Sequence, residues 1–166
     1  NDYIDVFQIG SRNMQNFPLI TEVSKKRKPM IIKRHYGASL RDLLGAAEYA
    51  LVNKNNKVVL CERGVSVPHT HKATSRFLLD LQIVPAVNEV SNLPLIVDPS
   101  HACFWHKWVE PLTLASIASG ANGLMIEFHP DPRNAAVDPL QPISFSFFRL
   151  DLEIPPKAKT FFLVIF

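Results

Sequence analysis

Three basic side chains occupy equivalent places in the sequence, each at or just after a short apolar run. They are Arg12, Lys33 and Arg63. If the runs are parallel strands, these cations meet at one edge of a sheet and can grip a phosphate or carboxylate, with Arg giving bidentate contacts. Gly10 and Gly64 permit close backbone approach beside them. The alternative is three solvated surface charges, which the shared position makes less favourable.

A second set of side chains has the chemistry of metal ligands. His101 and Glu127 each follow an apolar run, and Asp138 lies in the loop after Glu127. Imidazole and carboxylate groups suit first-row divalent metals. Asp98 closes the same run as His101 and is placed to orient that ring from behind. The alternative is a hydrogen-bonded histidine with two surface acids, and spacing alone narrowly favours this alternative.

The remaining histidines and cysteines have simpler interpretations. His69 and His71 have chelating spacing but lie in a Pro-containing loop. Cys61 is most simply a small buried apolar residue. Cys103 closely follows the predicted histidine ligand, and a metal contact there is the less favoured interpretation.

The elements that position these residues form a repeating pattern. Apolar runs of this kind, with little alternation, are typical of strands buried on both faces of a parallel sheet. Most are followed by a helix-like stretch, which predicts an α/β fold. The five runs span residues 4–9, 29–32, 57–60, 93–97 and 123–126.

Two helices carry start and stop signals. Residues 39–42 have the pattern of a capping box, which predicts the start of a helix. Pro111 is expected to open a second helix at its first position, and Gly120 to end it. The apolar face expected for that helix consists of Leu114, Ile117, Ala118 and Ala121.

Composition limits the remaining possibilities. The 166 residues have room for five strand–helix units, whereas a full (β/α)₈ barrel takes about 250. A net charge of +3 does not indicate a nucleic-acid binder, and no apolar run reaches the ~20 residues of a membrane helix. Two cysteines make a reducing, cytoplasmic location the default. The Phe-rich end has a possible strand at 160–166, and we expect unpaired sheet edges near Phe7 and Met125.

Several linked motifs in register resemble the 3-deoxy-D-arabino-heptulosonate 7-phosphate (DAHP) synthase family, in its smaller bacterial subgroup. The sister enzyme, 3-deoxy-manno-octulosonate 8-phosphate synthase, is similar at ERG (62–64), but the other motifs fit the heptulosonate enzyme better. The resemblance runs from Asp5 to about Gln141. The motifs are QIGSRNMQN (8–16), KR (33–34), LCERG (60–64), VDPSH (97–101) and MIEFHPDP (125–132).

The resemblance implies the last five units of a TIM (β/α)₈ barrel, with the first three units absent. It implies condensation of phosphoenolpyruvate with erythrose 4-phosphate, the first step of the shikimate pathway, on a divalent metal (Mn²⁺, Fe²⁺, Zn²⁺ or Co²⁺). It also implies a homo-oligomeric full-length protein. By matching motif, substrate is bound by Gly10, Ser11, Arg12, Lys33 and Arg63; Lys33 and His101 are catalytic; and His101, Glu127 and Asp138 hold the metal.

The departures from the family pattern define the remaining alternatives. The motifs Gly-Pro-Cys-Ser, which supplies a cysteine ligand, and Lys-Pro-Arg-Thr, which binds both substrates, are not found here. We therefore divide the chain into a partial barrel at 1–141 and an atypical tail at 142–166, and expect little or no synthase activity from the chain alone. The alternatives are octulosonate synthase specificity and a non-catalytic binding remnant.

Overall fold

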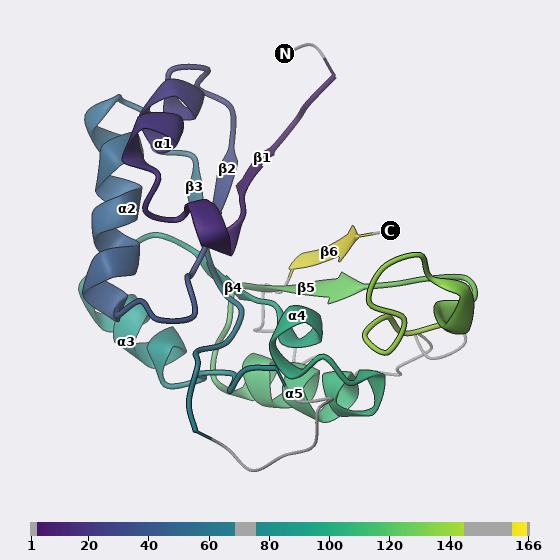
Figure 1. Ribbon diagram of the computed structural model, residues 1–166. Coiled ribbons are helices and arrows are strands. Elements are labelled where there is room, and N and C mark those ends of the chain that lie inside the picture. The colour runs from purple at the N-terminus through teal and green to yellow at the C-terminus, as the bar shows by residue number, and fades with distance from the viewer. Residues whose placement is uncertain (1–2, 69–75, 145–160, 166) are drawn as a thin grey trace.

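The computed structural model describes residues 3–68, 76–144 and 161–165, the last as backbone only. Its centre is a curled parallel sheet in which every strand pairs with the next along the chain (Figure 1). The strands are β1 (Phe7–Ile9), β2 (Met30–Lys33), β3 (Val58–Glu62), β4 (Leu95–Val97), β5 (Gly123–Glu127) and β6 (Phe161–Ile165). The first five are the predicted strands in the predicted order, so the parallel α/β prediction is confirmed.

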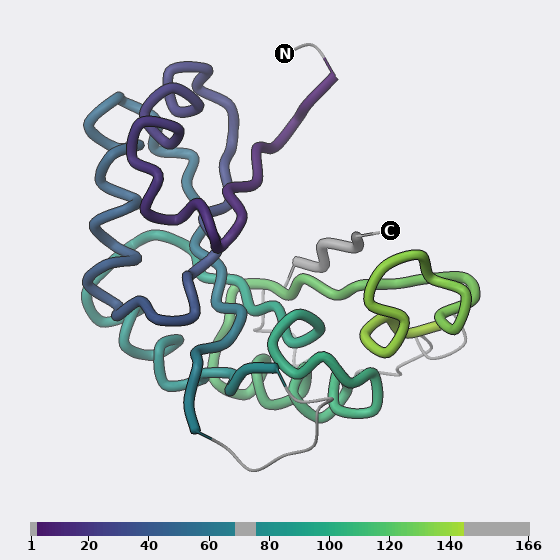
Figure 2. Tube along the Cα trace, in the orientation of Figure 1, coloured from purple at the N-terminus to yellow at the C-terminus, as the bar shows by residue number. Residues whose placement is uncertain are grey.

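The helices cover the outer side of the curled sheet (Figure 1). They are α1 (Phe17–Ser24), α2 (Leu40–Val52), α3 (Ile83–Val90), α4 (Pro99–Cys103) and α5 (His106–Ala118). Two 3₁₀ turns, η1 (Ser11–Asn13) and η2 (Pro132–Asn134), follow β1 and β5. After β5 the chain folds back as a loop, drawn in yellow-green in Figure 2. In the described residues no helix is long and apolar enough to cross a membrane.

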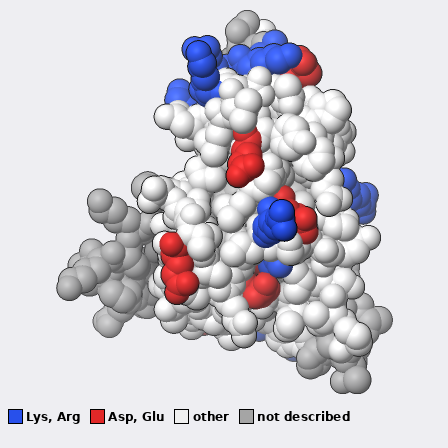
Figure 3. Space-filling model, turned by 90° about the vertical axis from the view of Figure 1, so that its left-hand side faces the viewer, with Lys and Arg blue, Asp and Glu red and all other residues white. Residues whose placement is uncertain are grey.

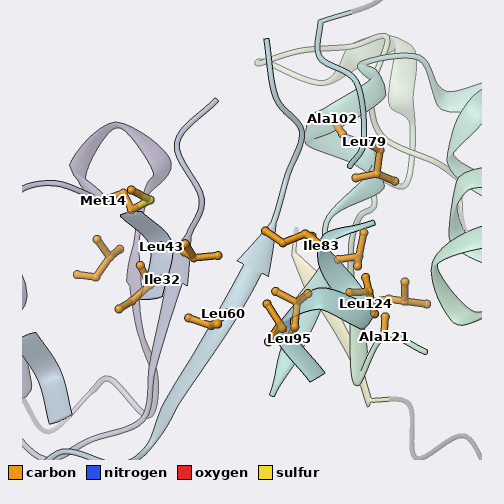
Figure 4. Close-up of a cluster of buried hydrophobic side chains, with 14 of the residues drawn as sticks. Met14, Ile32, Leu43, Leu60, Leu79, Ile83, Leu95, Ala102, Ala121 and Leu124 are labelled. Atoms are coloured by element: carbon orange, nitrogen blue, oxygen red, sulfur yellow. The ribbon is translucent and has the colours of Figure 1, made fainter. Parts of the chain in front are cut away.

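Alternate residues of the strands face opposite sides of the sheet, and this fixes two apolar clusters. Ile32, Leu60 and Leu124 belong to the large cluster that includes residues of the helices (Figure 4). The opposite face carries the smaller cluster Ile31, Cys61, Ile96 and Met125. Side chains along a strand alternate between the two faces of the sheet, which separates the clusters. A shift of one residue in strand register would therefore move each side chain to the opposite face.

Local sequence signals explain α2 well and α5 less well. Ser39 and Asp42 form the expected capping box, each accepting a backbone hydrogen bond from the other. The prediction that Pro111 opens a helix is wrong, because α5 begins five residues earlier at His106 and holds Pro111 inside. Gly120 does follow the helix end, with φ 91°, a conformation suited to glycine.

The predicted apolar face of α5 is only partly right, because Ile117 and Ala121 pack in the core whereas Leu114 and Ala118 are exposed. The buried residues of this helix are Val109, Thr113 and Ser116, whereas Leu114 is 45% exposed. The turn before the helix, where Phe104 has φ 62°, sets the direction from which α5 begins. Apolar spacing within the helix carries no information about that turn.

The strand near the end of the chain corrects one expectation. β6 pairs in parallel with β5 over its whole length, with Met125 opposite Leu163. The expected unpaired edge near Met125 is therefore wrong, because β6 satisfies the backbone groups on that side. In the described ranges no strand pairs with the outer edge of β1.

Basic side chains gather at the end of the molecule formed by the α1–β2 loop (Figure 3). Lys25, Lys26 and Arg27 are exposed there. Lys25 pairs with Glu22 one turn earlier on α1, 2.5 Å away. This group is a solvated helix end, as its composition predicts.

Candidate functional site

A cavity of about 700 Å³ opens at the carboxyl ends of the strands. This is the edge at which α/β barrels and open α/β sheets carry their chemistry. The cavity brings together Arg12, Lys33 and Arg63, the three cations that the sequence singled out. Its wall also includes Gly10, Ser11, Tyr36, Arg76, Phe77, His101 and Asp138.

The first strand ends in a turn that presents polar groups to this cavity. Arg12 lies in η1 directly after β1 and is exposed. Ser11 is buried beside it, and its hydroxyl accepts a hydrogen bond from Arg63 at 3.2 Å. This contact ties the end of β1 to the end of β3.

Arg63 is held between a hydroxyl and an aromatic ring. Its guanidinium lies 5.2 Å from the centre of the Phe77 ring. Burial lowers the pKa of Arg63, and the nearby cations Arg76 and Arg12 act in the same direction while Asp98 opposes them. A cation in this environment gains most from a bound anion, since the anion offsets both the burial and the like charge.

Lys33 points into the same cavity but already has a partner. Its ammonium lies 2.6 Å from Asp98 Oδ2, and both side chains are buried. Asp98 also contacts His101 Nδ1 at 3.0 Å. Burial raises the pKa of Asp98, but the His101 hydrogen bond and the Lys33 charge outweigh it and lower the pKa to about 2. Asp98 is thus a buried anion that orients both neighbours, as predicted for His101.

Behind these cations lies an ion pair that the sequence analysis missed. Arg34 Nη1 contacts Glu62 Oε2 at 3.0 Å and Asp80 Oδ2 at 2.7 Å. Glu62 Oε1 accepts a hydrogen bond from the Gly64 amide at 2.7 Å. Arg34 follows Lys33 in sequence, and Glu62 precedes Arg63. The Arg34–Glu62 pair therefore fixes the strand ends from which these two cavity residues project. Burial raises the pKa of Glu62 against the opposing effect of Arg34.

The predicted metal ligands are only partly assembled. His101 Nε2 lies 3.8 Å from Glu127 Oε2, and Asp98 holds the other ring nitrogen. Glu127 also accepts a hydrogen bond from Gln141. Asp138 lines the cavity, but its carboxylate contacts Arg76 at 3.2 Å. Within the described residues no group of three His, Cys, Asp or Glu side chains is close enough to hold a metal.

The donors nevertheless fit a divalent metal in kind. An imidazole with its far nitrogen fixed by a carboxylate is the usual arrangement of a metal-binding histidine. His101 and Glu127 present nitrogen and oxygen donors on neighbouring elements, and Asp138 reaches the same cavity. The site therefore suits a first-row metal once Asp138 leaves its present partner.

The cysteines take no part in this arrangement. Cys103 is buried, and its thiol donates to the Trp105 carbonyl at 3.4 Å. Burial raises its pKa to about 11. Cys61 belongs to the small apolar cluster, as expected from the sequence. His69 and His71 lie outside the described residues.

Arg76 is a charged cavity residue that the sequence analysis did not find. It lies in the β3–α3 loop, the same loop that begins with Arg63 and Gly64. A loop that leaves the carboxyl end of a strand in an α/β fold is a general indication of site residues. Nothing in the local sequence marks Arg76 more strongly than other basic residues.

A curled parallel sheet with four cations and a histidine–carboxylate pair at its carboxyl edge defines an α/β barrel-type protein with a cation-rich cavity at that edge. The family model described as the DAHP synthetase I family matches residues 1–161, so the chain belongs to this family. That match extends beyond Gln141 into the segment predicted to be an atypical tail.

Similarity to individual proteins agrees with the family model. A phospho-2-dehydro-3-deoxyheptonate aldolase of Thermotoga maritima is 39% identical over 148 residues, covering 89% of this chain and 43% of that protein. The solved structure of a truncated 3-deoxy-D-arabino-heptulosonate 7-phosphate synthase from Thermotoga maritima is also 39% identical. It has a TM-score of 0.83 and covers 89% of this chain and 55% of that chain.

A more distant relative bears the name of the sister activity. A 2-dehydro-3-deoxyphosphooctonate aldolase of Desulfotalea psychrophila is 27% identical over 148 residues, covering 82% of this chain and 51% of that protein. The chain spans about half the length of the curated relatives it matches.

Proposed function

We propose that this chain forms part of a DAHP synthase, which condenses phosphoenolpyruvate with erythrose 4-phosphate, consumes one water and releases phosphate. The observation that carries the proposal is the single cavity that gathers Arg12, Lys33, Arg63 and His101 at the carboxyl edge of the sheet. Phosphoenolpyruvate has a phosphate and a carboxylate, so its recognition requires several converging cations. The names of the more similar relatives support the heptulosonate reaction over the octulosonate one.

In this proposal different cations bind the phosphate and the carboxylate of phosphoenolpyruvate. Arg63 and Arg12 bind the phosphate with Ser11, because guanidinium groups match phosphate oxygens in a fork. Lys33, held in place by buried Asp98, orients the carboxylate. Gly10 lets the backbone approach the ligand. These contacts position phosphoenolpyruvate for attack, which is the main requirement of a reaction between two substrates.

The metal belongs to the same proposal. His101 and Glu127 would hold it, with Asp138 as a third ligand and Asp98 orienting the His101 ring. When bound, a divalent ion supplies Lewis-acid polarisation of the aldehyde carbonyl. His101 is thus catalytic through the metal, and Lys33 through its contact with the substrate.

We further propose that this sequence is a piece of a longer barrel, with a partial barrel at 1–141 followed by a tail. On this view the missing strand–helix units, a cysteine ligand and a Lys/Arg pair come from outside the sequence. The chain alone then binds phosphoenolpyruvate but turns it over poorly, and the complete protein works as a homo-oligomer in the cytoplasm.

The test is isothermal titration of phosphoenolpyruvate into the 166-residue chain. We expect binding that Arg63→Ala reduces about tenfold or more, since a charged hydrogen-bonding partner is lost. Arg41→Ala, an exposed arginine on α2 outside the cavity, is the matched control and should bind like the wild type. Equal affinity in Arg63→Ala and Arg41→Ala would rule out the proposed cavity.

Specificity is tested separately by following phosphoenolpyruvate consumption with Mn²⁺. Erythrose 4-phosphate should support any turnover better than arabinose 5-phosphate does. The reverse preference would favour octulosonate synthase activity. Turnover within about tenfold of a complete enzyme, a barrier difference of about 1.4 kcal/mol, would contradict the proposed incompleteness.

A further inference from the structure

Arg76 and Asp138, which both line the cavity, form an ion pair. Arg76 comes from the β3–α3 loop and Asp138 from the loop after β5, and Arg76 Nη2 lies 3.2 Å from Asp138 Oδ1. The Arg76 guanidinium also lies 4.0 Å from the centre of the Phe104 ring. Packing on that ring keeps the arginine at the cavity wall whether or not the carboxylate stays in contact.

Each member of this pair also belongs to another group. Arg76 is one of four cations around the cavity, close enough to Arg63 to contribute to the lowering of its pKa. Asp138 is the carboxylate proposed as the third metal ligand. The pair therefore joins the anion-binding side of the cavity to the metal-binding side.

The pair is open to exchange. The two side chains are 30% and 31% exposed, whereas Lys33 and Asp98 are almost completely buried. Partly exposed pairs are held weakly because water screens them. An incoming phosphate can replace the Asp138 carboxylate on Arg76, since both offer oxygen acceptors to the same guanidinium fork.

We propose that Arg76 is a further anion-binding residue and that Asp138 is its internal counter-ion, shared between Arg76 and the metal. An anion on Arg76 releases Asp138 to the metal, and a metal on Asp138 releases Arg76 to the anion. The two ligands therefore strengthen each other's binding, and by thermodynamic linkage the effect is the same in both directions. This inference rests on the proposed function for the role of Asp138 as a metal ligand.

The test uses inorganic phosphate and Mn²⁺ as separate probes on the 166-residue chain, with calorimetry for phosphate and the electron paramagnetic resonance signal of free Mn²⁺ for the metal. Arg76→Ala should bind phosphate about tenfold more weakly, because one cation is lost, and Mn²⁺ more tightly, because Asp138 is free. Asp138→Asn should bind phosphate several-fold more tightly and Mn²⁺ more weakly. In the wild type each probe should raise affinity for the other.

Two matched changes in the loop after β5 serve as controls. Arg133→Ala and Asp131→Asn make the same changes of charge at exposed residues that do not line the cavity. They should alter neither affinity by more than about twofold, because exposed charges are strongly screened. Misfolding would lower both affinities of a variant together, so opposite changes in one variant cannot come from it.

Phosphate affinity that is unchanged in Arg76→Ala, or not increased in Asp138→Asn, overturns the inference. Absence of Mn²⁺ binding by the wild type overturns the metal site of the proposed function and with it the linkage between the two ligands. The phosphate measurements then still decide whether Arg76 binds anions with Asp138 as its competitor. The two failures are therefore distinguishable.

Discussion

Lys33 and Asp98 form a buried ion pair, 2.6 Å apart, although their strands are not neighbours in the sheet. Lys33 ends β2 and Asp98 follows β4, so β3 lies between them. Both side chains project from the face that carries Ile31 and Ile96, two residues earlier on each strand. The pair therefore crosses over β3 on the side of the sheet opposite the helices.

Asp98→Asn should destabilise the fold strongly. The substitution leaves the Lys33 ammonium buried without a counter-ion, and breaking such a pair costs about 3–5 kcal/mol. Urea denaturation followed by circular dichroism measures the loss. Asp131→Asn, the same change at an exposed residue, is the control and should alter the unfolding free energy by less than about 0.5 kcal/mol. A loss below about 1 kcal/mol in Asp98→Asn would contradict the ion pair.

The Arg34–Glu62 pair should show strong non-additivity. Arg34→Met leaves the Glu62 charge buried without its partner, and Glu62→Leu leaves Arg34 with Asp80 alone, whereas the double variant removes both buried charges. We expect each single variant to lose about 3–5 kcal/mol and the double variant to lose less than the sum of the two. Urea unfolding of the four proteins gives the coupling energy. Simple additivity would show that the residues do not depend on each other.

The Asp42 capping box should make stability depend on pH. Hydrogen bonds from the Ser39 side chain and backbone hold the pKa of Asp42 below its ordinary value. Its contribution is present above the ordinary carboxyl pKa of about 4 and is lost as pH falls through the lower folded pKa. Asp42→Ala should therefore lower the Tm at neutral pH, and the difference from wild type should shrink in acid. Glu48→Gln, an exposed acid on the same helix, should show no comparable trend.

The two cysteines should resist alkylation in the folded protein. Cys61 and Cys103 are buried, and burial raises the pKa of both thiols, that of Cys103 to about 11. Only about one thiol in a thousand is ionised at pH 8 when the pKa is 11, and the thiolate is the reactive form. Mass spectrometry after iodoacetamide treatment should find both unmodified when folded and both labelled in concentrated guanidinium. Rapid native labelling of Cys103 would place it in the open cavity instead.

The strands and their polar ends could be predicted from local sequence. Runs such as Met30–Lys33 carry β-branched and apolar residues with a cation at the carboxyl end, and a parallel sheet places such ends on one edge. The gathering of Arg12, Lys33 and Arg63 at one cavity follows from that rule. Their ligand remains a proposal.

Helix direction and edge pairing could not be predicted in the same way. The residues before α5 turn through a left-handed Phe104, and in the helix that follows Val109 and Thr113 are buried while Leu114 is partly exposed. The β6 strand pairs with β5 across 33 residues that separate the two elements in sequence. Neither arrangement leaves a periodic signal, because the first depends on a single turn before the helix and the second on a pairing between segments far apart in the chain.

The sequence by itself determined the α/β class, the strand order and the kinds of side chain at the carboxyl edge, because these depend on local composition and on the repeated succession of strand and helix. Only the tertiary structure decided which charges became partners. Lys33 pairs with Asp98, and Arg34 pairs with Glu62. Asp138 pairs with Arg76, although the sequence had predicted it as a metal ligand together with His101. Partner choice depends on the curl of the sheet and the course of its loops, since a charge pairs with whichever opposite charge the fold brings within about 4 Å.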